Sequence, residues 1–126
     1  TAEAGASDVF QRGFVTYANE AKQEMLGVPE ALLIEHGAVS EEVAREMADG
    51  ARRVASADWA VALTGVAGPG GGTADKPVGL VFAAVAGPDG TRVRRLQLFR
   101  DRALNRQLAA QAVLEMLRRD LARSAG

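Results

Sequence analysis

The short run at residues 59–63, Trp-Ala-Val-Ala-Leu, constrains the fold more than any other part of the sequence. It is almost wholly apolar, which is typical of a β-strand buried on both faces. Such a strand needs a layer of structure above and below its sheet. A second apolar run lies at 78–86, and apolar and polar residues alternate imperfectly over 93–99. Because the turn-forming Gly-Pro-Asp-Gly at 87–90 joins these two runs, we expect a β-hairpin there.

Helical patterns account for most of the remaining chain. Ser40 is expected to cap a helix whose apolar residues recur at helical spacing, and a long amphipathic helix is predicted over about 102–123. Shorter helices are predicted at 19–26 and 30–35, and the β-branched and aromatic residues within 11–17 predict a further strand. Strands that alternate with helices predict one α/β domain over residues 1–126, a three-layer sandwich with a mixed β-sheet flanked by helices.

Composition narrows the function. The chain has 126 residues, a formal net charge of −1, no cysteine and one histidine, His36. We therefore expect no metal site, no Ser-His-Asp triad and no nucleic-acid partner. No run of about 18 apolar residues occurs, so no membrane span is expected. Residues 1–7 lack a signal-peptide pattern and an initiator methionine, and so we expect a fragment or a processed chain.

The glycine-rich segment at 64–73 is the most unusual part of the sequence. Glycines let backbone N–H groups converge on an anion and let a ligand approach closely. The segment is not a P-loop, because Lys76 is followed by Pro77, and it is not a dinucleotide fingerprint, because a strand follows it. Two interpretations stay open: a flexible connector between strands, or a ligand-binding loop at the end of a buried strand.

Tyr17 and Lys22 flank the predicted start of the first helix. With Asn19 as the cap, Lys22 occupies the third helical position, where the helix dipole disfavours its charge by roughly 0.3–1 kcal/mol. That is less than one pKa unit, so desolvation would have to supply the rest of the shift that a neutral base needs. The alternatives are a solvated surface lysine and a tyrosine that packs on the core.

Other charged residues carry simpler interpretations. His36 is expected at a helix C-terminus. Arg92, Arg94 and Arg95 are expected on the solvated face of a hairpin strand. Arg102 follows Asp101, and its two interpretations are a local ion pair at a helix start and a phosphate clamp.

Four runs together resemble the CinA C-terminal domain family, which includes stand-alone nicotinamide mononucleotide deamidases. They are Arg-Gly-Phe-Val-Thr-Tyr-Ala-Asn-Glu-Ala-Lys at 12–22, His-Gly-Ala-Val-Ser at 36–40, the glycine-rich run at 64–72 and Lys-Pro-Val-Gly at 76–79. The resemblance covers about residues 6–121. It implies a cytoplasmic bacterial enzyme, a homodimer without cofactor or metal, that hydrolyses the carboxamide of nicotinamide mononucleotide to nicotinic acid mononucleotide and ammonia.

The resemblance also implies roles for particular residues. The family's catalytic set is similar to a Ser-Tyr-Lys arrangement, whose tyrosine and lysine fall on Tyr17 and Lys22. Attack by the serine would form an acyl-enzyme, and the lysine and tyrosine would relay a proton to ammonia. The implied substrate-binding residues are Thr64, Gly65, Gly68, Gly70, Gly71, Gly72 and Arg102.

The sequence departs from the family pattern in two places. The family's nucleophile belongs to a Glu-Ser-Cys-Thr-Gly-Gly run, which in the family lies shortly before the residues that match the start of this chain, and residues 1–126 contain no such run. We expect the serine to lie upstream and the chain alone to be inactive. None of the serines in the chain stands in that sequence context: Ser7, Ser40, Ser56 and Ser124. Thr1 is disfavoured as an N-terminal nucleophile.

The second departure is Arg100, which replaces the glycine of a family Phe-x-Gly-Asp-Arg run and puts the backbone of that turn in question. Two further readings of the whole chain stay open. One is a catalytically inactive nucleotide-binding or interaction domain of a CinA-like protein. The other is a dimerisation module of a larger CinA-type protein that carries a second domain upstream.

Overall fold

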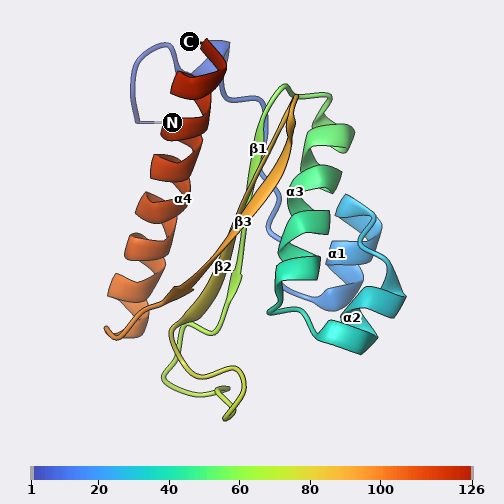
Figure 1. The fold of residues 1–126 in the computed structure, drawn as a ribbon, viewed down its shortest axis with the longest axis vertical. Coiled ribbons are helices and arrows are strands. Elements are labelled where there is room, and N and C mark those ends of the chain that lie inside the picture. The colour runs from blue at the N-terminus through green and yellow to red at the C-terminus, as the bar shows by residue number, and fades with distance from the viewer. Residues whose placement is uncertain (1, 126) are drawn as a thin grey trace.

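An antiparallel β-sheet separates two helical layers in the computed structural model, which describes residues 2–125 (Figure 1). Its strands lie in the order β1 (Ala60–Gly65), β2 (Leu80–Gly87) and β3 (Gly90–Gln97). One face is covered by α1 (Asn19–Leu26), α2 (Glu30–His36) and α3 (Glu41–Ala55), and the other by α4 (Arg102–Ala125). A short 3-10 helix, η1 (Ala6–Asp8), precedes them. The α/β class and the three layers are therefore confirmed.

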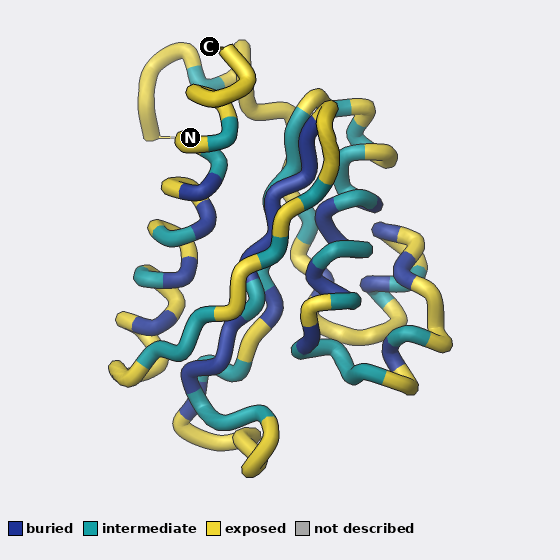
Figure 2. Tube along the Cα trace, viewed as in Figure 1, coloured by how far each residue is buried: buried dark blue, intermediate teal, exposed yellow. Residues whose placement is uncertain are grey.

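The central strand is β2, whose residues are all buried except the half-buried Phe82 (Figure 2). Burial on both faces was predicted for residues 59–63, but within residues 2–125 β1 pairs only with β2 and is mostly half-buried. The apolar run at 78–86 thus supplies the strand that both helical layers enclose. The hairpin is confirmed, since Gly87 pairs with Gly90 across a two-residue turn.

Two apolar clusters hold the layers together. On one face, α1, α2 and α3 pack Leu26, Leu33, Val43 and other residues against Ala84 and Ala86 of the sheet. On the other face, Val113 and Met116 of α4 pack against Ala83 and Val85. The alternation of side chains along β2 sends successive residues to opposite clusters. No helix in the described part of the chain combines the length and apolarity needed to cross a membrane.

Residues 11–17 do not form the predicted strand. Phe14 and Thr16 point toward the protein while Val15 and Tyr17 are exposed, which is the alternation of a strand. The segment nevertheless pairs with none of the described strands, so its backbone is extended but outside the sheet. The sheet is consequently antiparallel throughout residues 2–125, where a mixed sheet was expected.

Helix starts differ in detail from the prediction. Ser40 caps α3 as expected, because its hydroxyl accepts a hydrogen bond from the Val43 N–H at 3.3 Å. In α1, however, the cap is Ala18, which has no side-chain acceptor, and Asn19 is already helical. Lys22 therefore occupies the fourth helical position, one residue further from the helix end than predicted, so the dipole disfavours its charge less.

Candidate functional site

The glycine-rich loop between β1 and β2 is closed at its base by backbone hydrogen bonds. The Val66 N–H donates to the Leu80 carbonyl at 2.9 Å, and the Gly79 N–H donates to the Val66 carbonyl at 2.6 Å. Gly70 and Gly71 lie exposed at the rim, and a Cβ added at Gly70 would meet nothing within 4 Å. The loop thus has a fixed base and a rim of exposed, accessible backbone.

The connection between α2 and α3 lies against this loop. The Thr64 hydroxyl donates to the Ala38 carbonyl at 2.7 Å, and Lys76 Nζ donates to the His36 carbonyl. Gly37 has little spare room there, because an added Cβ would lie 2.7 Å from Lys76 Nζ. Residues 36–40, 64–72 and 76–79 are therefore brought together in space, although they are far apart in the sequence.

The N-terminal turn of α4 holds the other side of the loop. Arg102, the predicted substrate-binding arginine, donates from Nη1 to the Gly68 carbonyl at 3.1 Å. It forms no ion pair with Asp101 in the described structure, and the Asp101 carboxylate instead accepts from the Leu104 N–H at 2.9 Å. Gly68 itself is buried, whereas Gly65, like the rim glycines, is exposed.

Asn105 is the site residue that the sequence analysis missed. Its side chain is 2% exposed, donates to the Ala67 carbonyl at 3.3 Å and accepts from the Arg100 N–H at 3.0 Å. It ties the glycine-rich loop to the turn before α4. The signal was a polar residue on the face of the helix that also carries Ala109, Val113 and Met116.

The turn at Arg100 does not need the glycine of the family pattern. Ser56 is the sole non-glycine residue of 2–125 with a positive φ, so the Arg100 backbone avoids the left-handed region. The replacement of glycine by Arg100 is therefore compatible with the backbone of this turn.

Lys22 is buried, with 6% of its surface exposed, and its Nζ donates to the Thr16 carbonyl at 2.6 Å. Burial lowers the pKa of the Lys22 ammonium from its ordinary value, because the charged form loses solvent. The alternative of a solvated surface lysine is therefore wrong. The cause is desolvation and not the helix dipole alone.

Tyr17 follows Thr16 in the extended segment, and its side chain points away from the protein and is 87% exposed. The alternative in which it packs on the core is therefore wrong. Within residues 2–125 no hydrogen bond joins Tyr17 to Lys22, and none joins either residue to the glycine-rich loop. The structure thus places the predicted site residues apart: Lys22 against the Thr16 carbonyl, Tyr17 in solvent, and the glycine-rich loop with Thr64 and Arg102.

Other predicted positions add little. The His36 imidazole, half-buried at the end of α2 as expected, lies 3.5 Å from a Glu42 carboxylate oxygen. No three His, Asp or Glu side chains of residues 2–125 come together in a way that could hold a metal ion. Thr1, the disfavoured nucleophile, lies outside the described residues.

Comparison with known proteins gives consistent matches. The chain is 56% identical over 118 residues to a CinA-like protein of Anaeromyxobacter dehalogenans, and the matched region covers 94% of this chain and 29% of that protein. It is 47% identical over 117 residues to a putative competence-damage inducible protein of Caldicellulosiruptor bescii, and this match covers 93% of this chain and 28% of that protein. The chain thus spans less than a third of the length of these curated relatives.

Solved structures share the fold. The competence/damage inducible protein CihA of Agrobacterium tumefaciens superposes with a TM-score of 0.89 at 46% identity, covering 91% of this chain and 71% of that one. The competence damage-inducible protein A (ComA) of Klebsiella pneumoniae gives 0.91 at 35% identity, covering 96% and 75%. The sequence profile of the CinA C-terminal domain matches residues 1–121. This chain belongs to the CinA C-terminal domain family.

Proposed function

We propose that this chain forms most of an amidohydrolase site that converts nicotinamide mononucleotide to nicotinic acid mononucleotide and ammonia. The observation that carries the proposal is Lys22, a buried lysine with a lowered pKa, held in place by a backbone carbonyl. Buried, pKa-shifted lysines are typical of catalytic bases, because the neutral amine can accept a proton. The membership of the CinA C-terminal domain family agrees with this activity.

The proposed reaction begins with attack of a serine hydroxyl on the carboxamide carbon. The serine would come from a Glu-Ser-Cys-Thr-Gly-Gly run, which does not occur in residues 1–126. Neutral Lys22 would accept the hydroxyl proton, and Lys22 and Tyr17 would relay that same proton to the amide nitrogen, which departs as ammonia. Water would then hydrolyse the acyl-enzyme. No metal or cofactor is required by these steps.

The glycine-rich loop would bind the nucleotide part of the substrate. Gly70, Gly71 and Gly72 leave backbone N–H groups open to a phosphate, and Thr64 and Gly65 lie where β1 enters the loop. Arg102 is already oriented by the Gly68 carbonyl, and its remaining N–H groups suit a phosphate. In this proposal the functional form is a cytoplasmic homodimer.

The test is ammonia release from nicotinamide mononucleotide by a form of the protein that carries the serine run. Lys22→Met should lower turnover at least about a hundredfold, because the base is lost while side-chain volume is kept. Val15→Ala, at a position that is 86% exposed in the same segment, should retain full turnover. Full activity of Lys22→Met with an unchanged circular dichroism spectrum would remove Lys22 as the base.

A second candidate is a nucleotide-binding domain without catalysis. It is favoured by the exposed Tyr17 side chain, which has no hydrogen bond to Lys22 in the described residues. In that case calorimetry would detect binding of nicotinamide mononucleotide to the protein carrying the serine run, while no ammonia would appear. Binding that disappears in Arg102→Gln would place it at the loop.

A further inference from the structure

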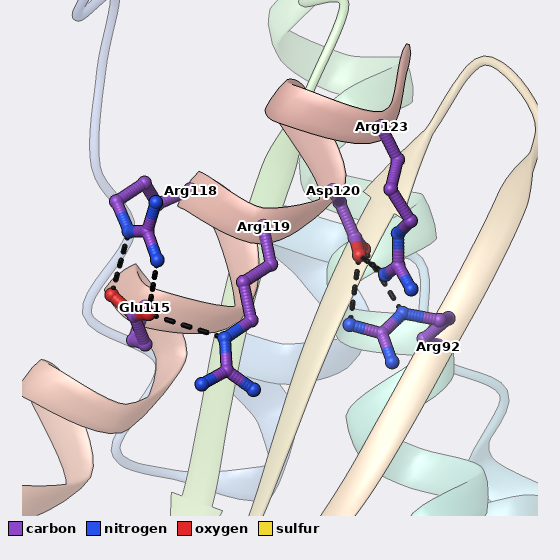
Figure 3. A network of polar contacts seen from close by, with 6 residues as sticks. All are labelled: Arg92, Glu115, Arg118, Arg119, Asp120 and Arg123. Carbon is purple, nitrogen blue, oxygen red and sulfur yellow. Dashed lines mark hydrogen bonds and ion pairs between the residues drawn. The ribbon is translucent and has the colours of Figure 1, made fainter. Parts of the chain in front are cut away.

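A groove lined by arginines runs between β3 and the C-terminal half of α4. Its volume is about 340 Å³. Figure 3 shows the ion pairs that several of these arginines form with Glu115 and Asp120. Arg92 and Arg94 share one face of β3 with Leu96 and pair with Val85 and Ala83, so they point to the face of the sheet that α4 covers. Both arginines are exposed, as predicted for this strand, although α4 packs on the same face of the sheet. The groove residues used below are Arg92, Arg94, Glu115, Met116, Arg119 and Arg123.

Asp120 orients two of these arginines. Its side chain is only 10% exposed, and its carboxylate receives Arg92 through two contacts, Nη2 to Oδ1 at 2.8 Å and Nε to Oδ2 at 3.1 Å. Arg123 also donates to it. Burial opposes ionisation of Asp120, but the hydrogen bonds from both arginines outweigh burial and hold its pKa below the usual range. The carboxylate therefore stays charged and fixes both guanidinium groups.

Glu115, about one turn earlier on α4, orients Arg118 and Arg119 in the same way. Arg118 donates to its carboxylate at 2.6 and 2.9 Å, and Arg119 donates through Nε at 3.2 Å. The hydrogen bond from Arg118 lowers the pKa of Glu115 to about 2. Arg119 uses only Nε in this contact, which leaves both of its Nη groups available to the groove.

The charges do not balance within this region. Among the described residues, the four lining arginines 92, 94, 119 and 123 are accompanied by Glu115 of the lining and by Asp120, which gives a net charge of +2 on a chain whose formal charge is −1. Arg94 has no carboxylate partner within residues 2–125. Pre-oriented guanidinium groups with spare donors are the groups that bind phosphate oxygens bidentately.

We propose that this groove binds a di- or triphosphate group, either inorganic or carried by a nucleotide. The positive charge concentrated in a space of about 340 Å³ suits a compact anion with several charges, and Met116 gives the groove an apolar floor. The groove is separate from the candidate site. The glycine-rich loop lies near the N-terminal end of α4 (Figure 1). Arg119 follows Arg102 in the same helix, and the rise of an α-helix places it about 25 Å further along the axis.

The test is isothermal titration of the protein with inorganic tripolyphosphate and, separately, with adenosine triphosphate, in a phosphate-free buffer at low salt. Arg94→Gln and Arg119→Gln should each weaken binding about tenfold, because each removes a charged donor from the anion. Arg94 has no internal partner, so its loss should leave folding intact. Arg106→Gln, an exposed α4 residue outside the groove, and Arg102→Gln, at the glycine-rich loop, should leave the affinity unchanged.

The two ligands identify the source of the phosphate. Equal affinity for both indicates that the phosphate chain is sufficient, and tighter binding of adenosine triphosphate indicates a nucleotide. The proposal is overturned if neither ligand binds, or if Arg106→Gln weakens binding as much as Arg94→Gln. It is also overturned if Arg102→Gln alone abolishes binding, because the anion would then occupy the glycine-rich loop.

Discussion

The place of Lys22 in a helix could be predicted from the sequence, but its burial could not. Its place near the start of a helix was predicted, and with it a small decrease in pKa from the helix dipole. The larger cause, burial to 6% exposure, depends on how residues 14–16 fold back beside α1, which the spacing of residues does not specify. The same limit applies to Asn105, whose partners Ala67 and Arg100 are brought to it only by the fold.

Tyr17 yields a prediction with a matched control. If its hydroxyl relays a proton, Tyr17→Phe should lower ammonia release by about a hundredfold, while the free energy of unfolding stays within about 0.5 kcal/mol of wild type, since the side chain is 87% exposed. Steady-state assays on the serine-containing protein, beside the Val15→Ala variant, measure the effect. Wild-type turnover by Tyr17→Phe would assign the proton relay to another group.

At the level of elements, the prediction succeeded where a pattern is local and failed where it needs a partner. The hairpin turn, the Ser40 cap and the long helix α4 follow from nearby residues. Residues 11–17 have the alternation of a strand but no pairing partner among the described strands, and so they stay outside the sheet. A strand requires a neighbour, and its own sequence does not provide one.

The packing of α1 on α3 gives an element-level prediction. A Cβ at Gly50 would lie 2.0 Å from the Leu26 carbonyl oxygen, so the two helices can approach only because position 50 is glycine. Gly50→Ala should destabilise the protein by about 1–3 kcal/mol, although alanine is the better helix former by up to about 1 kcal/mol. Gly13→Ala, whose Cβ would make an ordinary 3.7 Å contact, should change stability little.

Urea unfolding of both glycine variants measures these differences. A Gly50→Ala protein as stable as wild type would mean that α1 moves away from α3 at little cost.

For the whole molecule, the α/β class and three layers could be predicted, because apolar strands bounded by amphipathic helices have few ways to bury both. The arrangement of the candidate site could not be predicted from the sequence. The contact of residues 36–40 with the glycine-rich loop joins segments separated by β1 and α3. Only the order of the family motifs along the chain indicated that they belong to one site.

The burial of Lys22 and the lowered pKa of its ammonium group are tested most directly by the free energy of unfolding as a function of pH. Because the folded pKa of Lys22 is below its unfolded value, the unfolded state binds more protons between the two values. Stability should therefore rise with pH across that window, up to the ordinary value of 10.5. Each unit of lowering corresponds to about 1.4 kcal/mol.

The measurement is the free energy of unfolding in urea from neutral pH to pH 10.5 for wild type and Lys22→Met, with Val15→Ala, at a position that is 86% exposed, as the control variant. Groups shared by the proteins cancel in the difference. The lowered pKa of Lys22 predicts that wild type gains stability relative to Lys22→Met as pH rises, and that Val15→Ala follows wild type. A difference between wild type and Lys22→Met that stays flat, or falls as pH rises, would contradict it.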